Sequence, residues 1–414
     1  MKLKRDQQGS HHIFLALVII VIVGVGFAGW RVFKKSHDKN QAPSKILTSN
    51  ASPEDKAVAA GKNLSNNNCK GTGETQFTHL PMNEADFSLL IPYGLTVGGH
   101  VTPIDHQYFQ PTIFQSPKDK YPVYAMADAK ITDIEVHAPE NGSNGRIRMV
   151  FTVSCTFFYY YDLVTSVESG IDKSHLPISV KAGQLIGHIG GQTLDFAVWN
   201  TKKPLTGFIN PSSYDGEAWK IYTDNPFLYY TPELRKIIEA KDPRTADPIE
   251  GKIDYDVDGK LIGNWFESGT NGYSGASGEG GAGDQHYYKS HLSFAPNLYD
   301  PSYFVVSVGS LYTIDNERHM QHVTAANSPN PADVDSNSGL IKYDLVDFDY
   351  IKSNGSSWDQ MAVSKNVKIK PKSDVFGCAL ALMKDSRTLK FEVVVGKQCS
   401  TISGFDSEVK TYTR

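Results

Sequence analysis

Two histidines and an aspartate lie within a few residues of one another in the segment GGHVTPIDHQYF (98–109). They are His100, Asp105 and His106. Imidazole nitrogens and carboxylate oxygens bind divalent metals and also act as general acids and bases. The alternative is a structural turn, in which Asp105 caps the backbone after Pro103 and His106 packs among aromatic residues. Residue types and spacing alone leave both interpretations open.

The segments that follow this cluster predict an all-β domain over residues 76–205. Short apolar runs alternate there with Gly, Pro, Asn and Asp, which is typical of strands joined by turns. The strand-like runs are residues 121–138, 145–164 and 193–200, and ENGSNG (140–145) is a turn between the first two. The polar cluster therefore precedes a series of strands that could hold it in place.

The order of the segments resembles the lysostaphin- and LytM-type zinc endopeptidases of the bacterial cell wall. The resemblance rests on PVYAMADAKIT (122–132), VKAGQLIGHIGG (180–191) and TLDFAVW (193–199), which match the non-catalytic scaffold of that family. It covers about residues 95–200 and does not extend to the second half of the chain. It implies a LytM-like antiparallel β domain with the duplicated hybrid motif fold.

The polar positions of the family motif are altered in this chain. Asp105 matches the aspartate of the first ligand motif, whereas Val101 stands where the family has histidine and His100 is displaced by one position. The closing His-x-His of the family, whose i, i+2 spacing turns both rings to one face of a strand, is replaced by Thr193 and Asp195.

What the resemblance implies for this chain is a His/Asp/Asp metal site made by His100, Asp105 and Asp195. Such a set is harder and richer in oxygen than the family's zinc site, so we expect Zn²⁺ to bind only weakly. Asp162 stands where the family has a histidine near the metal-bound water, and Asp162 and His106 are the candidate catalytic groups. An aspartate accepts a proton but does not stabilise an oxyanion as a neutral imidazole does.

The N-terminus predicts a transmembrane helix. Residues 13–30 carry no charge and are flanked by Lys and Arg on both sides, which suits a membrane span near the lower length limit. A cleaved signal peptide and a buried soluble helix are the alternatives, and the length of the apolar run favours an uncleaved anchor. Residues 1–35 are then a cytoplasmic stub with the anchor, and residues 36–75, rich in Asn, Ser, Lys and Ala, are a flexible linker.

Composition and cysteine content narrow the possible partners and the compartment. The 414 residues carry a net charge of −4 without a basic block in the folded part, so we expect no nucleic-acid partner. The four cysteines are Cys69, Cys155, Cys378 and Cys399, and an even number is compatible with disulfides and an oxidising exterior. Cys378 and Cys399 lie in separate strand-like runs and could pair, although four free buried thiols would give the same pattern.

Two further segments complete the predicted domain organisation. Residues 206–250 are a connector with a short helix over residues 231–241, which opens with Thr231 as N-cap and Pro232 in the first turn. Residues 251–414 are a second β domain, a sandwich or a small barrel. Its GNWF segment (263–266) resembles the short Gly-x-Trp signature of lipocalin-like barrels, a motif of only a few residues.

The start of the second domain contains two segments that could suggest ligand binding. The DxDxDG at residues 254–259 resembles a calcium loop, but Trp265 stands where the bidentate glutamate belongs, so a hairpin turning at Asp258-Gly259 is favoured. The glycine-rich stretch NGYSGASGEGGAGD (271–284) lacks the lysine and helix of a phosphate loop and predicts a loop between strands. His286 and His291 are five apart, which places them on opposite faces of a strand.

The sequence thus predicts a mainly β, single-pass membrane protein of the cell envelope, with most of the chain outside the cytoplasm. Its LytM-like domain is expected to be non-catalytic and to bind cell-wall glycan or peptide, or an envelope protein. One alternative is an active metal-dependent cell-wall endopeptidase with an atypical His/Asp/Asp site. The other is a structural or adhesive surface protein.

Overall fold

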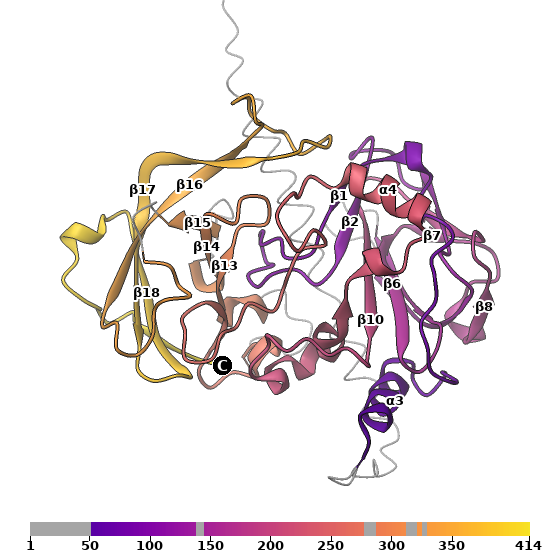
Figure 1. Cartoon of the computed structure of the whole chain (residues 1–414), viewed down its shortest axis with the longest axis horizontal. Coiled ribbons are helices and arrows are strands. Elements are labelled where there is room, and N and C mark those ends of the chain that lie inside the picture. The colour runs from indigo at the N-terminus through magenta and orange to yellow at the C-terminus, as the bar shows by residue number, and fades with distance from the viewer. Residues whose placement is uncertain (1–50, 138–144, 277–286, 312–320, 325–328) are drawn as a thin grey trace, which may run out of the picture.

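The computed structural model describes residues 51–137, 145–276, 287–311, 321–324 and 329–414. Antiparallel strands dominate, in two β units that lie side by side (Figure 1). The mainly β prediction is confirmed. No helix in these described ranges is long and apolar enough to cross a membrane, and the predicted span at residues 13–30 lies outside them.

The first unit is built on a large antiparallel sheet. Its strand order is β1-β2-β10-β6-β5-β4-β8, and the short strand β11 pairs with β10. The strands are β1 (Phe87–Ile91), β2 (Gln107–Pro111), β4 (Ala129–His137), β5 (Arg146–Thr152), β6 (Phe157–Val164), β8 (Ile178–Val180), β10 (Leu194–Asn200) and β11 (Thr223–Asp224). A second sheet of the order β3-β9-β7 packs beside it, made by β3 (Tyr121–Tyr124), β7 (Ser166–Val167) and β9 (Leu185–Ile189).

The large sheet has two apolar faces, which explains why its central strands are buried throughout. Alternate residues of a strand point to opposite faces. On one face Phe196 and Tyr161 belong to the main core of the first unit, which the small sheet helps to close. On the other face Trp199 and Tyr160 belong to a separate cluster. We call this second face the site face.

The described part of the predicted flexible linker is folded. Helix α3 (Pro53–Leu64) begins with a capping box in which Ser52 and Asp55 exchange hydrogen bonds. A disulfide then joins Cys69 to Cys155 in the hairpin between β5 and β6. The linker prediction relied on polar composition and overlooked the capping signal, so the correction is that residues 52–75 pack on the first unit.

The predicted connector contributes to both units rather than only joining them. It contains η3 (Pro211–Tyr222), two short 3-10 turns joined by non-helical backbone at Glu217, followed by η4 (Pro226–Leu228). The predicted short helix is confirmed as α4 (Pro232–Lys241), capped by Thr231. The remaining short 3-10 turns of the first unit are η1 (Glu84–Asp86) and η2 (Lys173–His175).

The second unit is a closed barrel, which settles the choice between sandwich and barrel. Strands β12 to β19 pair in chain order and β19 closes on β12. They are β12 (Gly263–Glu267), β13 (His291–Pro296), β14 (Phe304–Val308), β15 (Gln321–Thr324), β16 (Ile341–Ile351), β17 (Lys368–Met383), β18 (Thr388–Val395) and β19 (Lys410–Thr413). The turns η5 (Gly272–Ser274), η6 (Tyr287–Ser290), η7 (Gly309–Leu311) and η8 (Cys399–Thr401) lie between them.

The Gly-x-Trp segment starts the barrel. Trp265 on β12 is fully buried, and the guanidinium of Arg414 lies 4.0 Å from its ring centre. Arg414 also donates to the backbone oxygens of Ile262 and Val257, so the C-terminus closes the end of the barrel where β12 begins. Cys378 on β17 forms a disulfide with Cys399, as the paired strand-like runs allowed.

The predicted hairpin at the start of the second domain is wrong. Residues 252–262 form no strand, although Gly259 does adopt the left-handed conformation of a turn, with φ of 72°. Asp254 instead accepts a hydrogen bond from the Gly207 backbone, and Asp256 from that of Asn264. The aspartates therefore tie the segment to the connector and to β12, because each accepts a hydrogen bond from a backbone N–H there.

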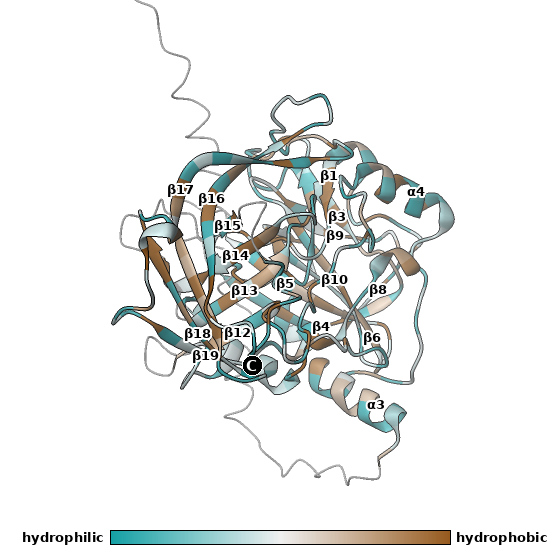
Figure 2. Cartoon of the chain, turned by 60° about the vertical axis from the view of Figure 1, so that its left-hand side comes forward, coloured by the Kyte–Doolittle hydropathy of each residue, from teal (hydrophilic) through white to brown (hydrophobic). Residues whose placement is uncertain are grey.

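A long arm of the barrel reaches the first unit. Strands β16 and β17 extend beyond the barrel and cross above it toward β1 (Figure 1), and the arm is more polar than the barrel strands (Figure 2). At its tip the Ser88 hydroxyl donates to the Met361 carbonyl at 2.7 Å, and the Gln110 amide donates to the Gln360 carbonyl at 2.8 Å. The two units are thus held together through β1 and β2.

Candidate functional site

The strands of the large sheet bring the predicted acids together on the site face. Asp195 on β10 lies opposite Asp162 on β6 and opposite Tyr108 on β2. Residues that lie directly opposite in an antiparallel pair project to the same face. Tyr108, Asp195 and Asp162 therefore form a row of polar side chains across three strands. Asp195 is 1% exposed, so its carboxyl group is removed from water.

The first predicted motif lies in a closed loop beside this row. Gly98 and Gly99 form the tip of a tight turn in which the backbones of Val97 and His100 exchange hydrogen bonds of 3.2 and 2.9 Å. Gly98 needs its positive φ of 52° for this turn. The Gly94 N–H donates to the Ile104 carbonyl at 2.9 Å and the Ile104 N–H donates to the Leu95 carbonyl at 3.0 Å. These two bonds close the base of the loop and place Asp105 and His106 just before β2.

Both carboxylate oxygens of Asp105 already have protein partners. The Lys220 ammonium lies 3.0 Å from Oδ1, and Nδ1 of His106 lies 3.3 Å from the same oxygen. The Trp219 indole donates to Oδ2 at 3.1 Å. Lys220 and Trp219 are adjacent in η3, so the connector supplies a cation and a neutral donor to a carboxylate of the first unit.

His106 bridges the two predicted aspartate ligands. Its Nδ1 faces Asp105, while its Nε2 lies 3.1 Å from the Tyr108 hydroxyl and 3.4 Å from Oδ2 of Asp195. An imidazolium donates from both nitrogens, which suits a position between two carboxylates. Burial works against the charged ring, but Asp195 and Asp105 outweigh it and raise the pKa of His106.

His100 lies next to this bridge but does not join it. Its ring centre is 5.7 Å from that of His106, and its Nε2 is buried without a hydrogen-bond partner. Burial, helped by the positive charges of His106 and Lys220, lowers the pKa of His100 to about 3, so its ring is neutral at physiological pH.

The remaining charges form a network around Asp105. Burial would raise the pKa of Asp105, but Lys220 and His106 hold it well below its usual range. Burial raises the pKa of Asp195 to about 7, with Asp162 adding to the effect and His106 opposing it. Asp162 itself accepts from the Leu163 backbone at 2.7 Å and lies 3.5 Å from Arg146.

Aromatic residues and the barrel cover the site face. Trp219 of η3 stacks on Trp199 of β10 with ring centres 5.7 Å apart, and the Arg148 guanidinium lies 4.4 Å from the Trp219 ring centre. Residues of the connector and the barrel complete the same buried cluster; they include Phe208, Tyr214, Ile253, Phe266 and Tyr273. The face on which Asp195 and Asp162 lie is therefore the interface between the two units.

The barrel also holds the loop of the first motif. The Gln321 side chain on β15 accepts from the Gly98 backbone N–H at 3.1 Å and donates to its carbonyl at 3.0 Å. A Cβ placed on Gly99 would lie 2.9 Å from the Tyr288 ring, so only glycine allows this close contact. The predicted site residues are thus enclosed from the barrel side.

The residues present do not suit the zinc ion that the resemblance implies. A metal ligand needs a free lone pair at about 2.0–2.2 Å from the ion. Of the predicted ligands, Asp105 has partners on both oxygens and Asp195 faces Thr193 and His106, whereas the Nε2 of His100 has no partner among the described residues. Within the described ranges, no three His, Cys, Asp or Glu side chains gather closely enough to hold a metal. The structure brings Asp105, His106 and Asp195 together with Lys220 as an ion network instead, and His100 lies beside it as a neutral ring.

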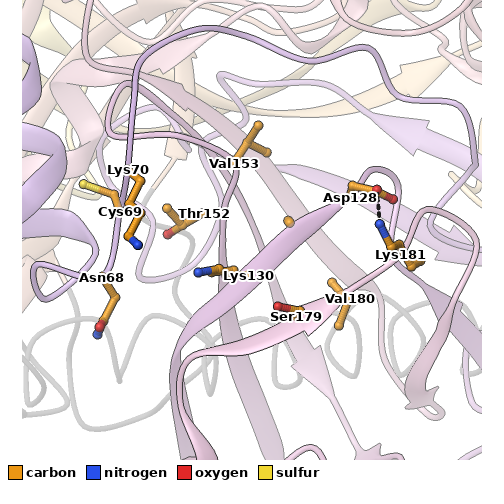
Figure 3. A pocket seen from close by; sticks show the side chains of 11 residues that line it. Asn68, Cys69, Lys70, Asp128, Lys130, Thr152, Val153, Ser179, Val180 and Lys181 are labelled. Carbon is orange, nitrogen blue, oxygen red and sulfur yellow. Dashed lines mark hydrogen bonds and ion pairs between the residues drawn. The ribbon is translucent and has the colours of Figure 1, made fainter.

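The first unit also has a separate pocket. It has a volume of about 270 Å³ and lies between the segment after α3 and the strands β4 and β8 (Figure 3). Lys70, Lys130 and Lys181 line it, and Lys181 is paired with Asp128. None of the predicted site residues lines this pocket. The Lys181 side chain, which does line it, is 80% exposed to solvent.

The sequence motifs did not indicate Glu217 or the basic and aromatic partners of the acids at the site; the residues missed are Arg146, Arg148, Glu217, Trp219 and Lys220. Arg148 lies within a predicted strand, where its burial under aromatic rings could not be foreseen. Trp219 is 114 positions from Asp105, in a connector that the family motifs do not cover. The only local hint was a Trp-Lys pair in a segment otherwise assigned no role.

Comparison with known proteins gives a partial likeness. No family model matches the sequence, and no curated protein matches it. Lysostaphin, in its NMR structure, is 18% identical over 31% of this chain and 49% of its own, with a TM-score of 0.22. A zinc containing peptidase from Vibrio cholerae is 20% identical over 32% and 39%, with a TM-score of 0.23. Helicobacter pylori Csd3, in its orthorhombic crystal, is 18% identical over 40% of both chains, with a TM-score of 0.23.

In each case this chain spans less than half of the matched protein. The matches include lysostaphin, from the class of proteins that the motifs resemble. At these TM-scores no residue role is transferred from them.

Proposed function

We propose that this chain is a membrane-anchored protein of the cell envelope whose LytM-like domain is non-catalytic. The single observation that supports the non-catalytic role is the covered site face. A wall endopeptidase must admit a peptide to the face that carries its polar residues, and here Trp219 and the barrel occupy that space. Motifs PVYAMADAKIT and VKAGQLIGHIGG support the LytM-like assignment of the first unit.

Other features support the envelope location. Two disulfides, Cys69–Cys155 and Cys378–Cys399, are what an oxidising exterior favours. The apolar run at residues 13–30 supports anchoring. With the site face covered, recognition of wall glycan, wall peptide or an envelope protein falls to the outer surface of the two units.

The test is an assay on purified cell-wall sacculi with added zinc. We expect the purified protein to release no soluble wall fragments, and to sediment with the sacculi if wall material is its ligand. Release of fragments that is lost in Asp195→Ala would establish the alternative, an active metalloendopeptidase. Sedimentation with whole cells, but with neither sacculi nor an envelope protein, would favour the adhesive alternative.

A further inference from the structure

We infer that the Lys220 ammonium takes the place of a divalent metal at Asp105, so that the polar cluster of the first unit is a metal-independent ion network. This inference deepens the proposed non-catalytic function and rests on it for the meaning of the site.

The first step is the charge that Asp105 requires. Its side chain is 5% exposed, and a carboxylate buried without a counter-charge is strongly unfavourable. Removing one partner of such a pair costs far more than the pair contributes, since an uncompensated charge stays behind. Asp105 therefore needs a nearby cation at all times, whether a metal or an ammonium.

The second step is the fixed position of Lys220. Its side chain is 3% exposed, which is rare for a lysine, and it has partners from three parts of the chain. Asp105 of the first loop lies 3.0 Å from Nζ, Glu217 of η3 lies 3.5 Å from it, and the Tyr273 ring centre in η5 lies 4.6 Å from it. The ammonium is thus held by the first unit, the connector and the barrel together.

The third step is exclusion of a metal. A zinc ion bonded to Asp105 would compete with Lys220 for Oδ1 and with Trp219 for Oδ2. It would also lie beside an ammonium and an imidazole flanked by carboxylates, where like charges repel at close range. Zinc could bind only if η3 withdrew Lys220 and Trp219, which would also uncover Trp199 and Arg148.

The test combines a double-mutant cycle with a zinc titration of the full chain. Lys220→Met should lower the folding equilibrium constant by roughly 100-fold or more, as expected when a buried pair loses one partner. The double variant Asp105→Asn/Lys220→Met should have a folding equilibrium constant at least about tenfold higher than that of Lys220→Met alone, because the uncompensated charge is gone. Lys181→Met, which breaks the exposed pair with Asp128, is the matched control and should change the constant by less than about fivefold.

In the second experiment, ZnCl₂ is titrated calorimetrically into the wild type and into Asp105→Asn. This comparison tests for zinc binding at Asp105 even if Lys220→Met does not fold. Equal heats in the two proteins support the inference. Stoichiometric zinc binding that Asp105→Asn abolishes would overturn it, as would a Lys220→Met variant no less stable than Lys181→Met. Wall cleavage without Asp105-dependent zinc binding would refute the proposed function and leave this inference standing.

Discussion

At the scale of residues, the chemistry of this protein depends on how buried charges are paired. Asp105 is neutralised by Lys220 and His106, whereas Asp195 shares His106 and has Asp162 as a neighbour across the sheet. The two aspartates therefore have opposite pKa shifts, although both are almost fully buried. This asymmetry makes Asp195 a member of the network that responds to pH near neutrality.

Asp195 should make the folded state less stable as pH rises from about 4 to 7. Burial raises the pKa of Asp195 from 3.8 to about 7, so in that window the unfolded chain has released a proton that the folded chain retains. His106 acts in the same direction at higher pH, since its pKa is raised and its stabilising proton is lost on titration. Asp195→Asn removes the carboxyl, so urea unfolding measured across this range should show a flatter profile than the wild type.

The slope that Asp195 contributes is at most about 1.4 kcal/mol per pH unit. Identical pH profiles for Asp195→Asn and the wild type would mean that Asp195 is ionised throughout and paired with His106 as a fixed salt bridge.

The sequence indicated the acidic residues and histidines of the network but not the basic residue that pairs with Asp105. The family resemblance predicted a metal site of His100, Asp105 and Asp195, with Asp162 and His106 as catalytic groups. The structure brings Asp105, His106 and Asp195 into contact because β2, β10 and β6 are neighbours in the sheet. The resemblance could not supply Lys220, which approaches only when the connector folds back on the site face. A charge pair between two distant segments produces no pattern in the sequence around either residue.

At the scale of elements, short local signals determined more of the structure than composition did. Thr231 with Pro232 predicted α4 correctly, and Ser52 with Asp55 was a similar signal that the polar linker interpretation overlooked. The hairpin at residues 252–262 failed for the opposite reason. Its alternating pattern fits a strand, but Asp254 and Asp256 are held by backbone groups of other segments.

Gly61→Ala should destabilise the protein, against the usual preference for alanine in helices. That preference favours alanine by about 1 kcal/mol, but a Cβ on Gly61 would lie 1.7 Å from the Cys155 carbonyl oxygen. We expect a lower Tm for Gly61→Ala, and a change within about 0.5 kcal/mol for Lys56→Ala on the exposed face of α3. A higher Tm for Gly61→Ala would show that α3 does not pack on the β5–β6 hairpin.

The Cys378–Cys399 disulfide should stabilise the barrel. It closes a segment with a sequence separation of 21 residues, which corresponds to about 3 kcal/mol if loop entropy dominates. Replacing both cysteines with alanine should lower the free energy of unfolding by that amount in guanidinium titrations. An unchanged midpoint would indicate that strand pairing of β17 with β18 already restricts this segment in the unfolded ensemble.

At the scale of the whole molecule, the two units form one body. Gln321 of the barrel hydrogen-bonds to the loop at Gly98, and the tip of the arm of β16 and β17 hydrogen-bonds to β1 and β2. The η3 segment packs between the two units. The sequence indicated two β domains but not the contact between them. The apolar residues of the site face have the same pattern as residues that face the core of a single domain. Covering that face is what separates this arrangement from an open wall-cleaving groove.

Membrane attachment is predicted to depend on the N-terminal segment alone. The full chain should remain in the membrane pellet after an alkaline carbonate wash, since residues 13–30 supply enough apolar length to span. Removal of residues 1–35 should shift the protein to the supernatant without lowering its Tm. Retention of the truncated protein in the pellet would place the membrane contact on the folded units instead.

Beneath the covered site face, Lys220 is proposed to neutralise Asp105 in place of a metal. Anomalous diffraction at the zinc edge, from crystals of the protein grown with zinc chloride, measures this directly. We expect no anomalous peak beside Asp105, and continuous density for Lys220 within hydrogen-bonding distance of the Asp105 carboxylate. A zinc peak bonded to Asp105 and Asp195, with Lys220 displaced, would contradict it.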